Sequence, residues 1–194
     1  MYVAMPQVPS NPTAFVSQEV ANYIGQNKNQ AMLADLDRAL LSKRNKSPKA
    51  FLEDCVCNLN RHQWFIGLPR YSQTPGKAAA QILHKKVDRP GYKDFEALYD
   101  SVRMAIINEY GVGDCVVYDC SLRLGHTLGI SPKDYVYVHA RPLEVVKVLT
   151  PQLLSGHAPR IKRQALVNAF PSLANLNTSE IEDILCFMYP YLFP

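Results

Sequence analysis

Two closely spaced glycines, Gly111 and Gly113, are the residues of this chain whose type and spacing could do chemistry. They stand in the segment Tyr110-Gly111-Val112-Gly113, between two stretches whose apolar residues recur at helical spacing. The pattern predicts a helix, a glycine hairpin and a second helix. Such a hairpin directs backbone amides and the positive end of a helix outward, where they can bind a phosphate of a nucleic-acid backbone. We expect Gly111, Val112 and Gly113 to supply those amides.

The residue after the hairpin allows two interpretations of it. Asp114 follows the second glycine directly. At this position its carboxylate would bind the amides at the start of the second helix and would repel an approaching phosphate. A glycine pair also occurs between helices where the chain only reverses direction. The segment is therefore either a phosphate site or an architectural turn between two packed helices.

Over residues 104–124 the chain resembles the helix-hairpin-helix motif. Ile107 before the glycines and Val116 after them keep the spacing of that motif, and Tyr110 stands where the family usually has proline. The family binds a DNA phosphate through hairpin amides, without sequence specificity. The resemblance thus implies that the hairpin contacts DNA. Both glycines are expected because the hairpin needs a positive φ and a close backbone approach.

A more distant resemblance is to the DNA glycosylases built on this motif. Their bifunctional members carry a lysine nucleophile two positions after the second glycine, where this chain has Cys115, so Schiff-base chemistry at that place is excluded. These enzymes also place a catalytic aspartate further along, and Asp134 stands at that distance. The surrounding residues differ from the Val-Asp-x-His of the family, and no iron-sulfur cysteine cluster follows. Asp134 is the candidate catalytic residue of this interpretation.

Basic side chains could complete a nucleic-acid surface around the hairpin. Arg123 either pairs with Asp119, four residues earlier, or lines a polar cleft beside the glycines. Lys85 and Lys86 belong to one of three basic clusters, each of which is otherwise a solvated helix face. The clusters are Lys43, Arg44, Lys46 and Lys49, then Lys77, His84, Lys85, Lys86 and Arg89, and then Arg160, Lys162 and Arg163. Two of them gathered around the hairpin would suit a duplex backbone.

The cysteines predict neither a metal site nor a disulfide framework. Cys55-x-Cys57 and the pair Cys115 and Cys120 lie within helical patterns, and their spacings do not form the paired knuckles of a structural zinc site. With Cys186 the count is five, an odd number. We expect buried thiols in a reducing, intracellular setting, with no metal and no cofactor.

Composition fits a globular protein with one core. The chain has 194 residues, 47% of them hydrophobic, and a formal charge of +4, which permits contact with phosphate without requiring it. The first residues do not form a secretory signal, and apolar stretches are interrupted by charges before they reach the length that a membrane span needs. The expected location is cytoplasmic, without a membrane partner.

Apolar residues at spacings of three and four predict about nine helices along the chain. Ser47 and Pro48 are a typical helix start, and Asn177 or Thr178 should cap the last helix. Residues 135–139 alternate like a strand but have no evident partner, so an extended segment or a short helix is expected there. The expected helices start near residues 13, 30, 48, 74, 95, 113, 142, 159 and 178.

Together these features predict an all-α fold. Residues 1–12 should form an irregular N-terminal arm, and residues 13–194 a single compact domain with one helix-hairpin-helix-like element. The first functional hypothesis is non-sequence-specific DNA contact, in DNA processing or a mobile element. The second is an α-helical interaction or scaffold protein, with another protein as its partner. The third is a glycosylase-like enzyme that uses Asp134.

Overall fold

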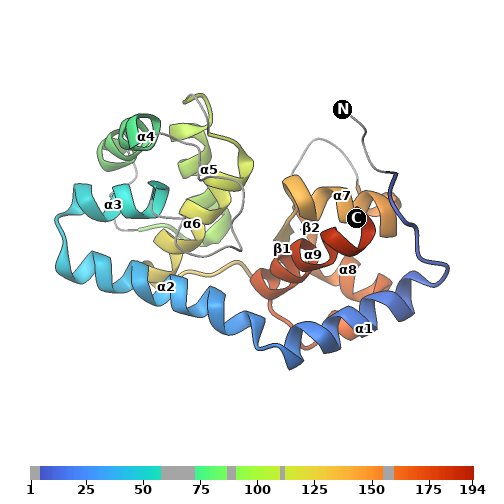
Figure 1. The fold of residues 1–194 in the computed structure, drawn as a ribbon. Coiled ribbons are helices and arrows are strands. Elements are labelled where there is room, and N and C mark those ends of the chain that lie inside the picture. The colour runs from blue at the N-terminus through green and yellow to red at the C-terminus, as the bar shows by residue number, and fades with distance from the viewer. Residues whose placement is uncertain (1–4, 58–72, 87–90, 110–111, 155–159) are drawn as a thin grey trace. The chain divides into compact units, whose positions relative to one another are not determined.

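The computed structural model describes residues 5–57, 73–86, 91–109, 112–154 and 160–194. In this part of the chain it contains nine α-helices and one two-stranded sheet, which confirms the all-α class (Figure 1). The chain divides into two compact units. Unit 1 comprises residues 1–32 and 132–194, and unit 2 comprises residues 33–131. The single domain expected over residues 13–194 stays a prediction.

The helices of unit 2 begin where the sequence provides caps. The hydroxyl of Ser47 accepts a hydrogen bond from the amide of Ala50 at 3.3 Å, and the carboxylate of Asp94 accepts one from the amide of Ala97 at 2.9 Å. The helices are α2 (Lys28–Asn45), whose first residues belong to unit 1, α3 (Pro48–Cys57), α4 (Gln73–Lys86), α5 (Phe95–Ile106) and α6 (Asp114–Leu128). The sequence predicts that the helix starting at residue 48 ends at Gly67 to Pro69, and these residues lie outside the described part of the chain.

Helices α5 and α6 pack against each other, and two glycines shape the end of α6. The helix ends at Leu128 and is followed by Gly129, whose φ of 72° is left-handed. One turn earlier, a Cβ on Gly125 would lie 2.5 Å from the backbone oxygen of Ile130 and 3.3 Å from the ring of Phe95. Glycine at 125 therefore lets α5 and the chain after α6 approach this closely.

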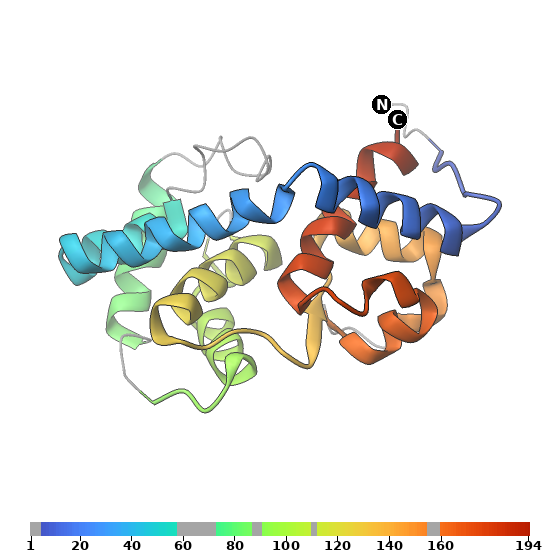
Figure 2. The ribbon, with the colours of Figure 1, turned by 90° about the horizontal axis from the view of Figure 1, so that it is seen from below.

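Unit 1 consists of helices from both ends of the chain and a small sheet. Its elements are α1 (Pro12–Gly25), β1 (Tyr135–Tyr137), α7 (Ala140–Leu149), the 3-10 turn η2 (Pro151–Leu153), β2 (Arg160–Lys162), α8 (Arg163–Ala169), the 3-10 turn η3 (Pro171–Leu173) and α9 (Thr178–Leu192). Helix α1 runs alongside α9, as Figures 1 and 2 show. The hydroxyl of Tyr23 on α1 donates to the carboxylate of Asp183 on α9 at 2.7 Å. Asn177 caps α9 in a reciprocal capping box with Glu180.

The sheet corrects one sequence-based expectation and answers a question that the sequence left open. Residues 159–170 were expected to form one helix, and residues 135–139, without an evident partner, an extended segment or a short helix. In the structure β1 and β2 pair antiparallel, and α8 begins only at Arg163. The pairing sets Val136 opposite Ile161, and both side chains are buried in the hydrophobic core of unit 1. The apolar burial gained by this pair favours the strand over the first turn of a helix.

Along the described residues, no helix combines the length and the apolar composition that crossing a membrane requires.

Candidate functional site

The hairpin region joins α5 to α6 in unit 2. After α5 the amide of Glu109 donates to the carbonyl of Ile106, and the amide of Val112 donates to the carbonyl of Glu109, both at 3.0 Å. Helix α6 then begins at Asp114, with Gly113 as its N-cap. Tyr110 and Gly111 lie outside the described residues. The structure therefore places Val112 and Gly113 of the predicted phosphate-binding segment.

Gly113 has neither the backbone conformation nor the close contacts that the sequence suggested. Its φ is −113° and its ψ is 178°, an extended conformation that any residue adopts. A Cβ at this position would meet nothing within 4 Å. The expected positive φ and close backbone approach are therefore wrong for Gly113. The residue is exposed and, having no side chain, makes no side-chain cap hydrogen bond to the first turn of α6. Its bare backbone leaves the start of a 15-residue helix open to a ligand.

The negative charge of Asp114, directly after the hairpin, is balanced by an arginine of α5. Asp114 was expected to hold the amides of α6, but its carboxylate accepts a hydrogen bond from Nε of Arg103 at 3.2 Å. Arg103 lies in the last turn of α5. Both side chains are well exposed, 44% for the arginine and 38% for the aspartate. The pair cancels the negative charge at the start of α6, so the predicted repulsion of a phosphate is reduced.

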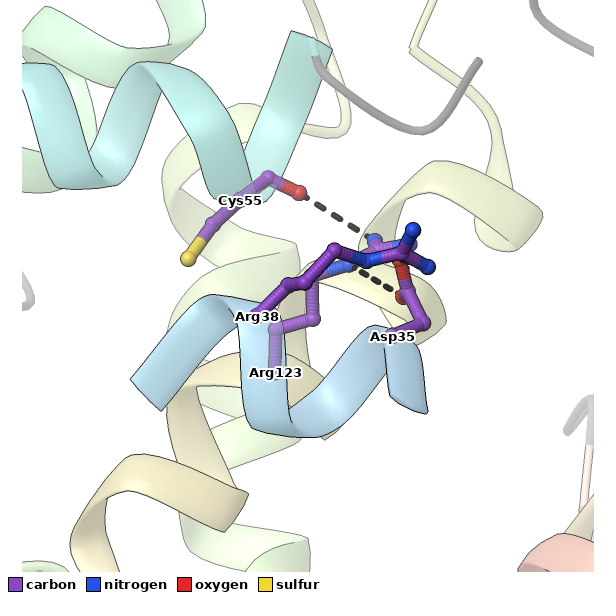
Figure 3. Close-up of polar contacts among 4 residues, drawn as sticks. All are labelled: Asp35, Arg38, Cys55 and Arg123. Atoms are coloured by element: carbon purple, nitrogen blue, oxygen red, sulfur yellow. Dashed lines mark hydrogen bonds and ion pairs between the residues drawn. The ribbon is translucent and has the colours of Figure 1, made fainter. Parts of the chain in front are cut away.

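Arg123 lies inside unit 2 and is not a surface residue. Its guanidinium is 5% exposed and pairs with the carboxylate of Asp35 at 2.7 Å, and it also donates to the backbone oxygen of Cys55 at 3.4 Å. Arg38 approaches the other oxygen of the same carboxylate at 3.4 Å. Figure 3 shows both guanidinium groups directed at Asp35.

This buried network ties α6 to α2 and α3. It corrects the prediction of Arg123 as a nucleic-acid contact, because a phosphate cannot reach a guanidinium that is buried and already paired. The network also explains the arginine. A planar guanidinium can bind a carboxylate and a carbonyl together in a way that lysine cannot.

The expectation of buried thiols holds for two of the four free cysteines among the described residues, since Cys186, like Cys115, is half-buried. Cys55 and Cys120 are fully buried, Cys115 is half-buried, and the side chain of Cys57 lies outside the described residues. Burial raises the pKa of the Cys55 thiol well above its usual value. Cys55 is therefore a protonated core residue and not a nucleophile.

The predicted basic contacts are distributed over several helices. Lys85 is exposed on α4, a helix that packs against α5, and the side chain of Lys86 lies outside the described residues. In the first basic cluster, the ammonium of Lys43 donates to the carbonyl of Thr127 at 3.1 Å, and Lys46 pairs with Asp54 at 2.6 Å. These two lysines already serve contacts within unit 2.

Asp134 belongs to unit 1, where it is exposed at the mouth of a pocket of about 410 Å³. The pocket lies at the start of β1 and the end of β2. Its lining consists of Lys133, Asp134, Tyr135, Lys162, Arg163 and Gln164. Sequence reasoning found Asp134 on the one hand and Lys162 and Arg163 on the other, and it missed that strand pairing brings them together. The catalytic role of Asp134 stays a prediction.

Comparisons of the chain with protein families, curated proteins and solved structures found no match. The functional argument therefore rests on the geometry of the two units.

Proposed function

We propose that the chain contacts the DNA backbone without sequence specificity, through the start of α6. The observation that carries the proposal is Gly113, an exposed N-cap without a side chain and without a side-chain hydrogen bond to the first turn of α6. Backbone amides at such a helix start point at a ligand, and the helix dipole adds partial positive charge. A phosphodiester oxygen can accept hydrogen bonds from these amides, and its negative charge is stabilised by the dipole.

The electrostatics of the surrounding surface support an anionic ligand. Arg103 pairs with Asp114, which reduces the negative charge at the start of α6. Lys85 is exposed on the neighbouring helix α4, and the whole chain carries a formal charge of +4. This mild positive charge favours association with a polyanion, and it predicts affinity that falls with added salt.

Replacing Gly113 with asparagine separates binding from folding. The amide oxygen of asparagine is a good N-cap acceptor, so Gly113→Asn should occupy the amides of α6 and raise the stability of the chain by a few tenths of a kcal/mol. The same change should weaken binding of duplex DNA roughly tenfold at low salt, because the capped amides no longer reach a phosphate. Fluorescence anisotropy across a salt titration, with thermal unfolding in parallel, measures both effects.

A matched control is Gly25→Asn. Gly25 is exposed in unit 1, and a Cβ there also meets nothing within 4 Å. This variant should bind DNA like the wild type. Equal affinity of Gly113→Asn and wild type, or wild-type affinity that does not change between low and moderate salt, would refute the proposal.

A protein partner is the second candidate for the same region. Met104, one residue after Arg103 on α5, is 74% exposed, the kind of side chain that anchors a protein interface. Under this alternative the hairpin is an architectural turn, and Met104→Ser would abolish partner binding while Gly113→Asn would not.

A further inference from the structure

We propose that the pocket at the β1–β2 ribbon of unit 1 binds a phosphate group. Lys133 and Lys162 would supply the positive charge, and the ribbon would hold them in place. The inference does not depend on the hairpin, which lies in unit 2.

Strand pairing creates the pocket. Tyr135 on β1 stands directly opposite Lys162 on β2, so the lysine beside β1 and the lysine on β2 both reach the same hollow. The inner pair of the ribbon, Val136 and Ile161, is buried in the core and fixes the register. Two cations separated by 29 positions in the sequence therefore line one small cavity.

The two ammonium groups are available for a ligand. No carboxylate among the described residues forms an ion pair with Lys133 or Lys162, and Asp134 pairs with neither although it lines the same pocket. Both lysines are exposed. A bound anion would give these two lysines a charge-assisted hydrogen bond. Lys147 already has one, because it pairs with Glu144 at 2.7 Å.

The rear of the pocket is rigid. The guanidinium of Arg163 donates to the carbonyls of Leu176 and Ala174 at 2.8 and 2.7 Å, and the amide of Arg163 donates to the carbonyl of Asp134 at 2.8 Å. Arg163 is thus a fixed positive charge that needs no reorganisation when a ligand enters. A site with one fixed guanidinium and two lysines placed by the ribbon suits a compact dianion or a phosphodiester.

Substitutions that change charge in opposite directions test the pocket. The probe is inorganic phosphate at constant ionic strength, with chloride as the reference anion, and the readout is the amide NMR shifts of residues 133–135 and 162–164. Lys133→Gln and Lys162→Gln should each weaken phosphate binding about two- to fivefold. Asp134→Asn should strengthen it by a similar factor, and Lys147→Gln, an exposed lysine on α7, should leave it unchanged.

A second arm distinguishes a nucleic-acid phosphate from a small ligand. A short DNA duplex that shifts the same amides at lower concentration than phosphate identifies a phosphodiester backbone, and no shift with the duplex identifies a small phosphorylated molecule. Unchanged amides with phosphate, or identical titrations of the two pocket variants and Lys147→Gln, would overturn the proposal. Loss of DNA binding in Gly113→Asn with an intact phosphate response would leave the pocket standing, so the two proposals fail separately.

Discussion

Arg123 and Arg38 share one carboxylate partner, Asp35, yet their surroundings differ sharply. Arg123 is buried and also donates to a carbonyl, whereas the side chain of Arg38 is 44% exposed. An unpaired buried charge is costly because it has lost its water, while an exposed ion pair contributes little. Burial therefore determines which of the two arginines holds unit 2 together.

Arg123→Gln should lower the free energy of unfolding by about 3 kcal/mol, because it leaves Asp35 with a much weaker partner in a largely buried site. The matched change Arg38→Gln should cost less than about 1 kcal/mol. Urea unfolding followed by circular dichroism compares the two. Similar losses in both variants would contradict this account of the network.

The same residue also shows where sequence reasoning stops. The helical spacing of Asp119 and Arg123 predicts a local ion pair, but it gives no sign of the contact between Arg123 and Asp35, which lies 88 positions earlier on α2. Local periodicity carries no information about contacts at that separation. The glycine hairpin was recognisable because its signal is local, and the pocket lysines were not linked because only strand pairing joins them.

Asp183 links its own protonation to the stability of unit 1. Burial raises its pKa from 3.8 to about 6, and the hydrogen bond from Tyr23 and the charge of Lys28 offset this only in part. Because the folded pKa exceeds the unfolded value, the folded state binds more protons between about pH 4 and pH 6. The free energy of unfolding should therefore fall as the pH rises through that window.

Asp183→Asn tests this linkage, since asparagine stays neutral and still accepts a hydrogen bond from Tyr23. Between about pH 4 and pH 7 the wild type should lose up to about 3 kcal/mol more stability than the variant. Thermal or urea unfolding of both proteins at matched ionic strength gives the difference. Parallel pH profiles would show that Asp183 is not the group responsible.

At the scale of elements, helix starts were predictable and the sheet was not. Ser47 and Asn177 mark their helices because a capping side chain acts on amides two or three residues away. The strand β2 was assigned to a helix because Arg160, Ile161 and Lys162 have no strand signature of their own. Only contact with Val136, on a strand 25 residues earlier, makes them extended.

Gly125 offers a test of packing at this scale. A methyl group at 125 would meet the backbone oxygen of Ile130, which cannot move without disturbing the end of α6. Gly125→Ala should therefore destabilise the chain by about 1–3 kcal/mol. Gly25→Ala, where the added methyl meets nothing, should change stability by no more than about 1 kcal/mol. A tolerated Gly125→Ala would mean that α5 and α6 are less tightly packed than described.

At the scale of the whole molecule, the two units differ in whether they are formed by one continuous stretch of the chain or by two. Unit 2 is one continuous stretch, residues 33–131, whereas unit 1 combines residues 1–32 with residues 132–194. Sequence periodicity gave no sign of this division, because neither composition nor a proline-rich or glycine-rich linker marks residue 32 or residue 132. The boundary follows from long-range contacts alone.

The union of α1 with α9 has a consequence for the order of events during synthesis. Tyr23 leaves the ribosome 160 residues before Asp183, its hydrogen-bond partner. All of unit 2 emerges from the ribosome in this interval. Unit 2 can therefore fold before α9 is made, while the apolar face of α1 is still uncovered. Helix α1 is made before unit 2 but can pack on α9 only after α9 has been synthesised, and until then the nascent chain exposes Val16, Val20 and Tyr23 to any partner that binds apolar segments.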